Sequence, residues 1–270
     1  MTKKLWIPML ATVAGFVLLA NAAGPHGHGR SVSMKSRGAV TSCSDMEVTF
    51  DRRPAVTAEE QRTIPRAVGT LKASPMENGG IEVIGWDRNE YSVTLCKAAS
   101  PDQRELLGQI SLSVQGGRVS VQGPSSDEDW TAYLIVRTPK DGALDLEAHN
   151  GPIGLHGVNG RVTARAVNGP ISMKNCEGEI DVETQNGPID WSGGGGNVRL
   201  RAQNGPLNLE VPENYASAVR VETSEHSPVR CRATQCRQAM RMWEHPSRIE
   251  FGKGEPVVRL TTVNGPVNLE

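Results

Sequence analysis

Asn150-Gly151-Pro152-Ile153 belongs to a pattern that returns every eighteen residues and decides the fold. Further strong copies are Asn168-Gly169-Pro170-Ile171, Asn186-Gly187-Pro188-Ile189, Asn204-Gly205-Pro206-Leu207 and, after an interruption, Asn264-Gly265-Pro266-Val267. Weaker copies stand at the half-steps: Asp141-Gly142-Ala143-Leu144, Asn159-Gly160-Arg161-Val162, Glu177-Gly178-Glu179-Ile180 and Gly195-Gly196-Asn197-Val198. A fixed nine-residue unit of this kind predicts a stacked-repeat architecture.

Each unit predicts one short strand. Counted from the glycine of each unit, the second and fourth following residues are apolar in all eight units, and most residues between them are polar. Such alternation is typical of a strand with one buried face. The buried positions are Leu144, Leu146, Ile153, Leu155, Val162, Ala164, Ile171, Met173, Ile180, Val182, Ile189, Trp191, Val198, Leu200, Leu207 and Leu209.

The proline after each strong Asn-Gly pair favours a parallel solenoid over a meander of hairpins. Asn-Gly is normally a good hairpin turn. A following proline has no N–H for the closing hydrogen bond, and it pushes the preceding residue towards extended geometry. We therefore expect open corners and eighteen-residue coils, each made of two strand–corner units. Ile153 should then lie beside Ile171 in parallel, whereas a meander would place it beside Val162 in antiparallel.

Stacked coils also predict what lies along the outside. Equivalent asparagines should fall above one another at about 4.8 Å and form an amide ladder. One outward column then alternates in charge from coil to coil, as neighbours across strands should. It contains Glu147, Arg165, Glu183 and Arg201.

The N-terminus has the pattern of a secretory signal. Lys3 and Lys4 precede an apolar stretch, and Ala20-Asn21-Ala22 fits a cleavage site. We expect residues 1–22 to be a cleaved signal peptide; an uncleaved anchor is the alternative. Residues 23–44, rich in Gly, Ser and His, are expected to be a flexible linker, and residues 45–270 the solenoid domain. His26 and His28 could hold copper or nickel weakly, but a solvated tail is the preferred interpretation.

Alternating segments upstream of the repeat predict further strands, at 46–50, 81–86, 91–95, 110–114, 118–121 and 133–137. One short helix is expected at 101–107. Ser100 and Gln103 would form its capping box, and Pro101 would occupy the first turn.

Downstream of the repeat, residues 212–229 read as one further coil, with Val219 and Val221 inside. Residues 230–256 break the period and form an irregular insertion. Its arginines, with Met240, Met242 and Trp243, fit either a partner-binding loop or a cap over the end of the solenoid, and the cap is favoured.

Five cysteines in an exported chain indicate disulfides with one thiol left over. Cys231 and Cys236 are expected to pair locally; metal ligation by these two is the alternative. Cys43 with Cys96 is a second candidate pair. Cys176 falls at a corner and is the candidate free thiol.

Several features resemble a bacterial family of exported adhesin-like domains of unknown function, related to the head-GIN putative adhesins. They are Gly80-Ile81-Glu82-Val83-Ile84-Gly85-Trp86, Ile135-Val136-Arg137-Thr138-Pro139 and the Asn-Gly ladder. The resemblance covers about residues 45–270. It implies a right-handed parallel β-helix and brings no catalytic residues. The family often has Ser-Gly where this chain has Asn-Gly-Pro.

The composition and motifs favour a non-enzymatic function. A net charge of −1 excludes a general attraction to nucleic acid, and 4% aromatic residues limit stacking surfaces for bases or sugars. Nucleophile, zinc-protease and phosphate-loop motifs are absent, so we predict no catalytic residues, cofactor or metal. The period matches calcium-binding nonapeptides, but the aliphatic position after each glycine excludes them. His149 and His156 flank the first strong corner and are expected to be solvated.

The leading hypothesis is an exported β-solenoid of the periplasm, cell envelope or medium that binds an unknown glycan or protein. It is expected to have no transmembrane segment after signal cleavage. The alternative is a polysaccharide-active β-helix enzyme, a lyase or glycosidase. Such an enzyme would use clustered carboxylates, for which Asp145, Asp181, Glu147 and Glu183 are the candidates.

Overall fold

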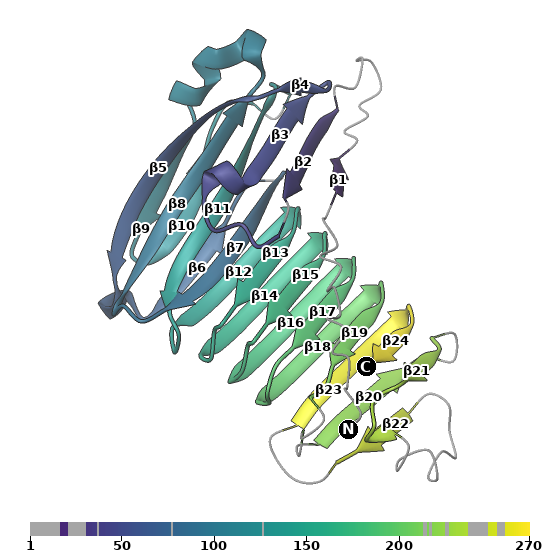
Figure 1. Ribbon diagram of the computed structural model, residues 1–270. Helices are drawn as coiled ribbons and strands as arrows, with labels where there is room; N and C mark the ends of the chain where they lie inside the picture. Colours follow the sequence, from purple (N-terminus) through teal and green to yellow (C-terminus); the bar gives the residue numbers. More distant parts are fainter. Residues whose placement is uncertain are drawn as a thin grey trace, which may run out of the picture.

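The computed structural model describes residues 17–20, 31–36, 38–76, 78–125, 127–212, 215, 218–224, 227–236, 248–252 and 257–270. The described chain is all-β, with three sheets and three short 3₁₀ helices (Figure 1). The helices are η1 (Cys43–Asp45), η2 (Arg66–Val68) and η3 (Pro101–Gly108). Within these residues no helix is long and apolar enough to span a bilayer.

The smallest sheet is antiparallel and has four strands, which are β1 (Val17–Ala20), β2 (Val32–Ser36), β3 (Met46–Phe50) and β4 (Arg53–Pro54). The other two sheets have ten strands each, and the repeat alternates between them (Figure 1). Both mix parallel with antiparallel pairs.

We call one of these the long-strand sheet; its order is β22-β20-β23-β18-β16-β14-β12-β6-β10-β9. Its strands are β6 (Thr70–Ser74), β9 (Ser111–Gln115), β10 (Arg118–Gln122), β12 (Ala143–Asn150), β14 (Arg161–Asn168), β16 (Glu179–Asn186), β18 (Asn197–Asn204), β20 (Ala218–Thr223), β22 (Arg248–Phe251) and β23 (Val257–Asn264).

The other is the short-strand sheet, with the order β21-β24-β19-β17-β15-β13-β7-β11-β8-β5. Its strands are β5 (Val56–Pro65), β7 (Gly79–Trp86), β8 (Glu90–Ala99), β11 (Trp130–Pro139), β13 (Ile153–His156), β15 (Ile171–Lys174), β17 (Ile189–Ser192), β19 (Leu207–Glu210), β21 (Val229–Cys231) and β24 (Val267–Leu269).

The strands of the repeat pair in parallel at the predicted interval. Ile153 of β13 lies beside Ile171 of β15, and Leu144 of β12 lies beside Val162 of β14. The parallel pairing is therefore confirmed, and the hairpin meander is wrong. The proline of each corner is the physical reason, because it cannot donate the hydrogen bond that closes a tight turn.

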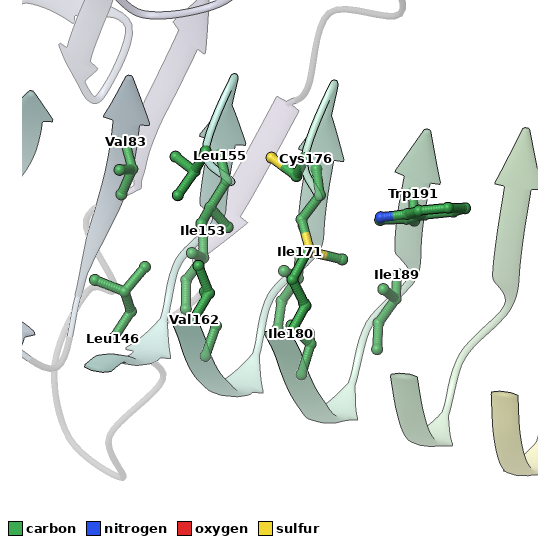
Figure 2. Close-up of a cluster of buried hydrophobic side chains, with 14 of the residues drawn as sticks. Val83, Leu146, Ile153, Leu155, Val162, Ile171, Cys176, Ile180, Ile189 and Trp191 are labelled. Atoms are coloured by element: carbon green, nitrogen blue, oxygen red, sulfur yellow. The ribbon is translucent and has the colours of Figure 1, made fainter. Parts of the chain in front are cut away.

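The core lies between the two large sheets. All sixteen side chains predicted to point inward from the repeat are at most 2% exposed. Ile153 and Leu155 of β13, for example, share one apolar cluster with Leu146 of β12 and Val162 of β14 (Figure 2). Burial of each aliphatic side chain contributes about 1.5–3 kcal/mol, so the repeat provides most of the apolar stabilisation in this part of the molecule.

The corners of the repeat stack through both side chain and backbone. The predicted amide ladder runs through Asn150, Asn168, Asn186, Asn204 and Asn264, with Nδ2–Oδ1 distances of 2.8–2.9 Å. It extends one step further, to Asn78, at 3.1 Å. Each corner glycine also donates its N–H to the carbonyl of the next asparagine, as Gly169 does to Asn186 at 3.0 Å. At the last corner, Gly265 donates to the hydroxyl of Ser227 instead, so the asparagine pattern ends there.

The order of the last repeats differs from the sequence prediction. Residues 212–229 were expected to stack directly on the repeat that ends at residue 210. Instead β23 pairs with β18 on one side and β20 on the other, and β24 lies between β19 and β21. The C-terminal strands β23 and β24 therefore lie between the repeat and strands β20 and β21, although β20 and β21 come earlier in the sequence. Val219 and Val221 are buried as expected, but against Val258 and Leu260.

The segment 230–256 is also less irregular than expected. It contains β22, which pairs antiparallel with β20 at the end of the long-strand sheet. Covering a terminal strand in this way fits a cap. Met240, Met242 and Trp243 lie outside the described residues, so the choice between cap and binding loop stays open for them.

Two further predictions need correction: the flexible linker at 23–44 and the helix at 101–107. Within the expected linker 23–44, β2 pairs with β3, because Val32 and Met34 alternate with polar residues and pack on one face. The expected helix at 101–107 is the 3₁₀ segment η3, and Gln103 has non-helical dihedral angles. Gln103 does not form the capping box with Ser100, because its amide binds Glu128 and the backbone N–H of Asp129. Residues 1–16 and 21–30, including His26 and His28, lie outside the described residues.

An ion pair occupies the inner side of β5, the edge strand of the short-strand sheet. The Glu60 carboxylate forms ion pairs with Lys97 Nζ at 3.0 Å and with Arg62 at 2.8 Å. It also accepts a hydrogen bond from the backbone N–H of Leu112 on β9 at 3.3 Å. The side chains of Lys97 and Glu60 are only 12% and 17% exposed. Glu60 therefore joins the two large sheets at their N-terminal edges, and charge at an edge strand opposes further strand addition.

We expect this ion pair to make stability depend on pH. Burial alone would raise the pKa of Glu60, but the bonds from Lys97 and Leu112 and the charge of Arg62 outweigh it and lower the pKa. The stabilisation is therefore present above the ordinary value of 4.5 and is lost as the pH falls through the lower folded pKa. Glu60→Gln should cost about 1–3 kcal/mol at neutral pH and progressively less in acid. Urea denaturation of wild type and variant between neutral and acid pH measures this change in the free energy of unfolding.

Asp87→Asn is the matched control for that measurement. Asp87 pairs with Lys140 at 2.8 Å, but its side chain is 87% exposed, so its removal should leave stability unchanged. A cost for Glu60→Gln that is the same at neutral and acid pH would contradict the role of the Glu60 charge.

Candidate functional site

The outer face of the long-strand sheet carries the predicted column of alternating charge. Glu147, Arg165, Glu183 and Arg201 lie in register on β12, β14, β16 and β18. Residues two positions earlier form a second column, in which Asp145 and Asp181 are separated by Thr163. The eighteen-residue period places every one of these side chains on the outside, because successive strand residues point to opposite faces.

A hollow of about 550 Å³ lies on this face, over β12, β14 and β16. Its centre is Arg165, with Glu147 and Glu183 on the neighbouring strands. The rest of the lining mixes polar with apolar side chains of modest size, and no Phe, Tyr or Trp side chain takes part. It consists of Ser74, Pro75, Ala148, His149, Ala166, Val167 and Gln185.

Arg165 is held less tightly than the equivalent arginine two strands away. Arg201 contacts Asp181 at 3.0 Å and Glu183 at 3.1 Å, and its side chain is 35% exposed. Among the described residues, the one ion pair of Arg165 is with Asp145 at 3.8 Å, and its side chain is 55% exposed. Asp145 has a closer partner in Lys72, at 3.2 Å. The guanidinium of Arg165 therefore keeps N–H groups that can serve a ligand.

The carboxylates proposed for an enzyme are largely engaged in ion pairs. Asp145 contacts Lys72, Asp181 contacts both Arg199 and Arg201, and Glu183 contacts Arg201. Glycoside cleavage needs two carboxyl groups that act on opposite sides of one bond. Surface pairing explains these acidic residues without such a role. Among the described residues, no group of three or more His, Cys, Asp or Glu side chains is arranged to hold a metal ion.

A second polar cluster lies on the outer face of the short-strand sheet. Glu82 is only 6% exposed; His156 Nε2 lies 2.7 Å from one carboxylate oxygen, and the Tyr133 hydroxyl donates to the other at 3.2 Å. Burial and the Glu82 charge raise the pKa of Tyr133 well above 10. Gly154 leaves the space for this carboxylate, since a Cβ there would meet it. The expectation that His156 is solvated is wrong, whereas His149 is exposed.

The sequence gives no sign of this cluster, because Glu82, Tyr133 and His156 come from three distant segments. Only the parallel pairing of β7 with β11 and β13 brings them together. Val40 and Met34 of the N-terminal segment pack beside Tyr133. The N-terminal segment therefore packs beside Tyr133, while the His156 side chain stays 26% exposed.

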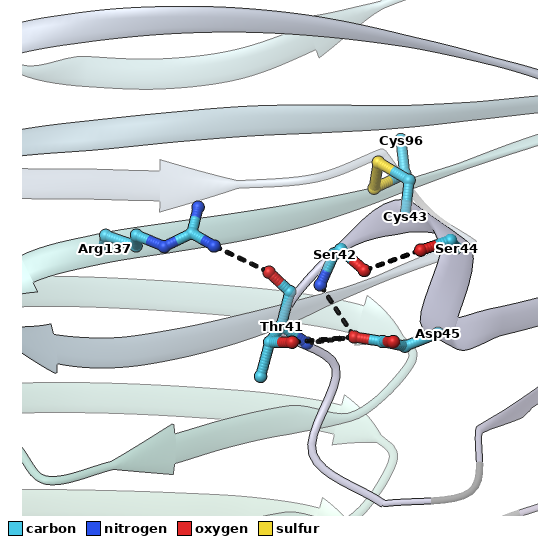
Figure 3. The surroundings of a disulfide bond; sticks show 7 residues. All are labelled: Thr41, Ser42, Cys43, Ser44, Asp45, Cys96 and Arg137. Atoms are coloured by element: carbon cyan, nitrogen blue, oxygen red, sulfur yellow. Dashed lines mark hydrogen bonds between the residues drawn. A yellow bond between two sulfur atoms is a disulfide. The ribbon is translucent and has the colours of Figure 1, made fainter.

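Both expected disulfides are present. Cys43 and Cys96 join the N-terminal segment to β8 with an S–S distance of 2.00 Å (Figure 3). Beside this bond, Arg137 donates to the carbonyl of Thr41 at 2.8 Å. Cys231 and Cys236 form the second disulfide. Cys176 is free and buried, and burial raises the pKa of its thiol, which disfavours the thiolate form.

Comparison with known proteins gives only distant likenesses. Neither a protein-family model nor a curated protein sequence matches this chain. A crystal structure of a "putative cell adhesion protein" from Clostridium sporogenes is 11% identical, with a TM-score of 0.46, over 79% of this chain and 99% of that one. A "putative adhesin" from Bacteroides fragilis is 9% identical, with a TM-score of 0.32, over 80% and 97% of the two chains. A "putative lipid binding protein" from Parabacteroides distasonis is 10% identical, with a TM-score of 0.30, over 79% and 96%.

Proposed function

We propose that this chain is an exported, non-enzymatic binding module built on a right-handed parallel β-solenoid. The eighteen-residue parallel register, continuous from β12 to β18 and from β13 to β19, supports the solenoid. Export is supported by the basic and apolar N-terminal pattern together with two disulfides, which persist in oxidising compartments. The protein would then act in the periplasm, the cell envelope or the medium.

In this proposal residues 1–22 are the signal peptide, and the folded module is residues 45–270 with the β2 segment docked on it. Cleavage after Ala22 would remove β1 and leave β2 and β3 in place. The disulfide from Cys43 would then keep the N-terminal segment attached to β8.

The observation that carries the binding role is the hollow around Arg165. It stands on strands that are paired on both sides, so its side chains are held on a rigid support. Rigid placement lowers the entropic cost of binding. A shallow hollow with one under-used guanidinium suits recognition, and it lacks the paired, unengaged carboxylates that hydrolysis needs.

The proposal predicts saturable binding without turnover. The mature protein should retain at least one partner when it is presented with a panel of envelope polysaccharides, peptidoglycan and envelope proteins. The same incubations should release no cleavage products over hours. Solid-phase binding and product analysis by mass spectrometry measure the two parts.

Turnover of a polymer that is abolished by Asp181→Ala would reverse this conclusion and establish the enzyme. The complete absence of a binder from the panel would also contradict the binding role. A mature N-terminus other than residue 23 after export in a bacterial host would correct the signal boundary alone.

A further inference from the structure

The polar groups in the hollow alternate between acceptors and donors along the stack. Glu147 offers a carboxylate, Arg165 offers N–H groups on the next strand, and Glu183 offers a carboxylate on the strand after that. Neighbouring strands are about 4.8 Å apart. A ligand that lies across the strands therefore meets acceptor, donor and acceptor in turn.

Hydroxyl groups match this order best, because each can donate one hydrogen bond and accept two. Gln185, Ser74 and His149 at the margins can also both donate and accept. An extended peptide would instead bind by pairing its backbone with the free edge of a strand. β12, β14 and β16 have no free edge, because each is paired on both sides.

The charges around the hollow nearly cancel, so it offers an acidic ligand no net attraction. Glu183 is paired with Arg201 at 3.1 Å and the nearby Asp145 with Lys72 at 3.2 Å, which leaves Glu147 beside Arg165. A polymer with a carboxylate or sulfate on each unit would meet repulsion from Glu147 next to Arg165. An uncharged ligand meets no such repulsion.

We propose that the hollow binds an uncharged, hydroxyl-rich glycan chain, with Arg165 as the central donor and Glu147 and Glu183 as the flanking acceptors. This rests on the binding role proposed above and names its site and ligand class. Since no Phe, Tyr or Trp side chain offers a broad stacking platform, a single short oligosaccharide binds weakly, with a Kd of about 1 mM. Tight attachment then requires a long polymer or many copies of the protein on one surface.

The test uses the full mature chain and probes of defined charge. Uncharged probes are dextran, laminarin and xylan oligosaccharides; acidic probes are polygalacturonate and alginate; a mixture of envelope proteins is the third class. Binding is measured by titration calorimetry and on an immobilised array. At least one uncharged probe should bind, and Arg165→Ala should weaken it about tenfold or more, as loss of a charged hydrogen bond does.

Arg161→Ala is the matched control. Arg161 lies on the same strand, outside the hollow, and pairs with Glu179 at 2.8 Å. The Arg161→Ala variant should leave binding unchanged. Glu147→Gln and Glu183→Gln keep a hydrogen-bond acceptor, so they should weaken binding less than alanine at the same positions. Thermal unfolding of each variant checks that the fold is kept.

Two outcomes would overturn the glycan site and leave the binding module standing. They are preferential binding of an acidic polymer or a protein, and binding of an uncharged glycan that Arg165→Ala does not weaken. Failure of every probe class would overturn the binding module as well.

Discussion

Replacing Trp191 by alanine should lower the free energy of unfolding by about 3–5 kcal/mol. Trp191 is 2% exposed and is the largest of the fully buried side chains (Figure 2). It lies in register between Met173 and Leu209, and its ring meets that of Tyr215 edge to face, with centroids 6.5 Å apart. The neighbouring strands β15 and β19 are tied to β17 by backbone hydrogen bonds, so they cannot collapse into the cavity. Urea denaturation of wild type and variant measures the loss.

Trp191→Phe is the informative control. The indole N–H is buried and has no hydrogen-bond partner in the described structure, so its removal costs no bond. Phenylalanine also keeps part of the ring contact and leaves a smaller cavity than alanine, so we expect a clearly smaller loss. Equal losses for Ala and Phe would show that the cavity argument is wrong at this site.

Gly169→Ala should destabilise the protein by about 3 kcal/mol or more, at the upper end for overpacking. A Cβ at Gly169 would lie 2.7 Å from the carbonyl carbon of Gly151 and closer still to its oxygen. These are backbone atoms of the preceding repeat, and they cannot rotate away as a side chain can. The ladder bond between Asn150 and Asn168 holds the two corners at this separation. Relief would require the stacked repeats to part, with loss of the hydrogen bonds between them.

Gly108→Ala is the control, because a Cβ at Gly108 would meet no atom within 4 Å. It should change stability by no more than about 0.5 kcal/mol. Chemical denaturation of both variants decides the matter. If Gly169→Ala were as mild as Gly108→Ala, the corners could not be as closely stacked as described.

The repeat from residue 141 to 210 could be predicted almost completely from the sequence. Its inward side chains, parallel register, charge column and asparagine ladder all follow from one short period and from the proline of each corner. Of the site, Glu147, Arg165 and Glu183 were placed in one column in advance. The contribution of Ser74 and Pro75 to the hollow could not be predicted, because β6 was not predicted and its pairing with β12 is long-range.

The missed strand β5 lacks the alternation of buried apolar and exposed polar residues on which such predictions depend. In β5, the inward positions include Glu60 and Arg62, so the segment reads as a polar stretch. The charge of Glu60 is tolerated there only because Lys97 neutralises it and the backbone N–H of Leu112 bonds to it, whereas the Arg62 side chain is 57% exposed. The partners lie more than thirty residues away, and no local pattern reports them.

The amino-acid sequence by itself determined the repeating strand unit, since its period, its apolar positions and its prolines act within a few residues of one another. Only the tertiary structure decided which repeat lies next to which at the C-terminal end. Val258 and Leu260 offer the neighbouring strand the same apolar spacing as Val219 and Val221, so either segment fits on β18. The choice of β23 depends on contacts between segments far apart in the chain, among them the continued ladder from Asn204 to Asn264, whose amide hydrogen bond exists only in the assembled fold.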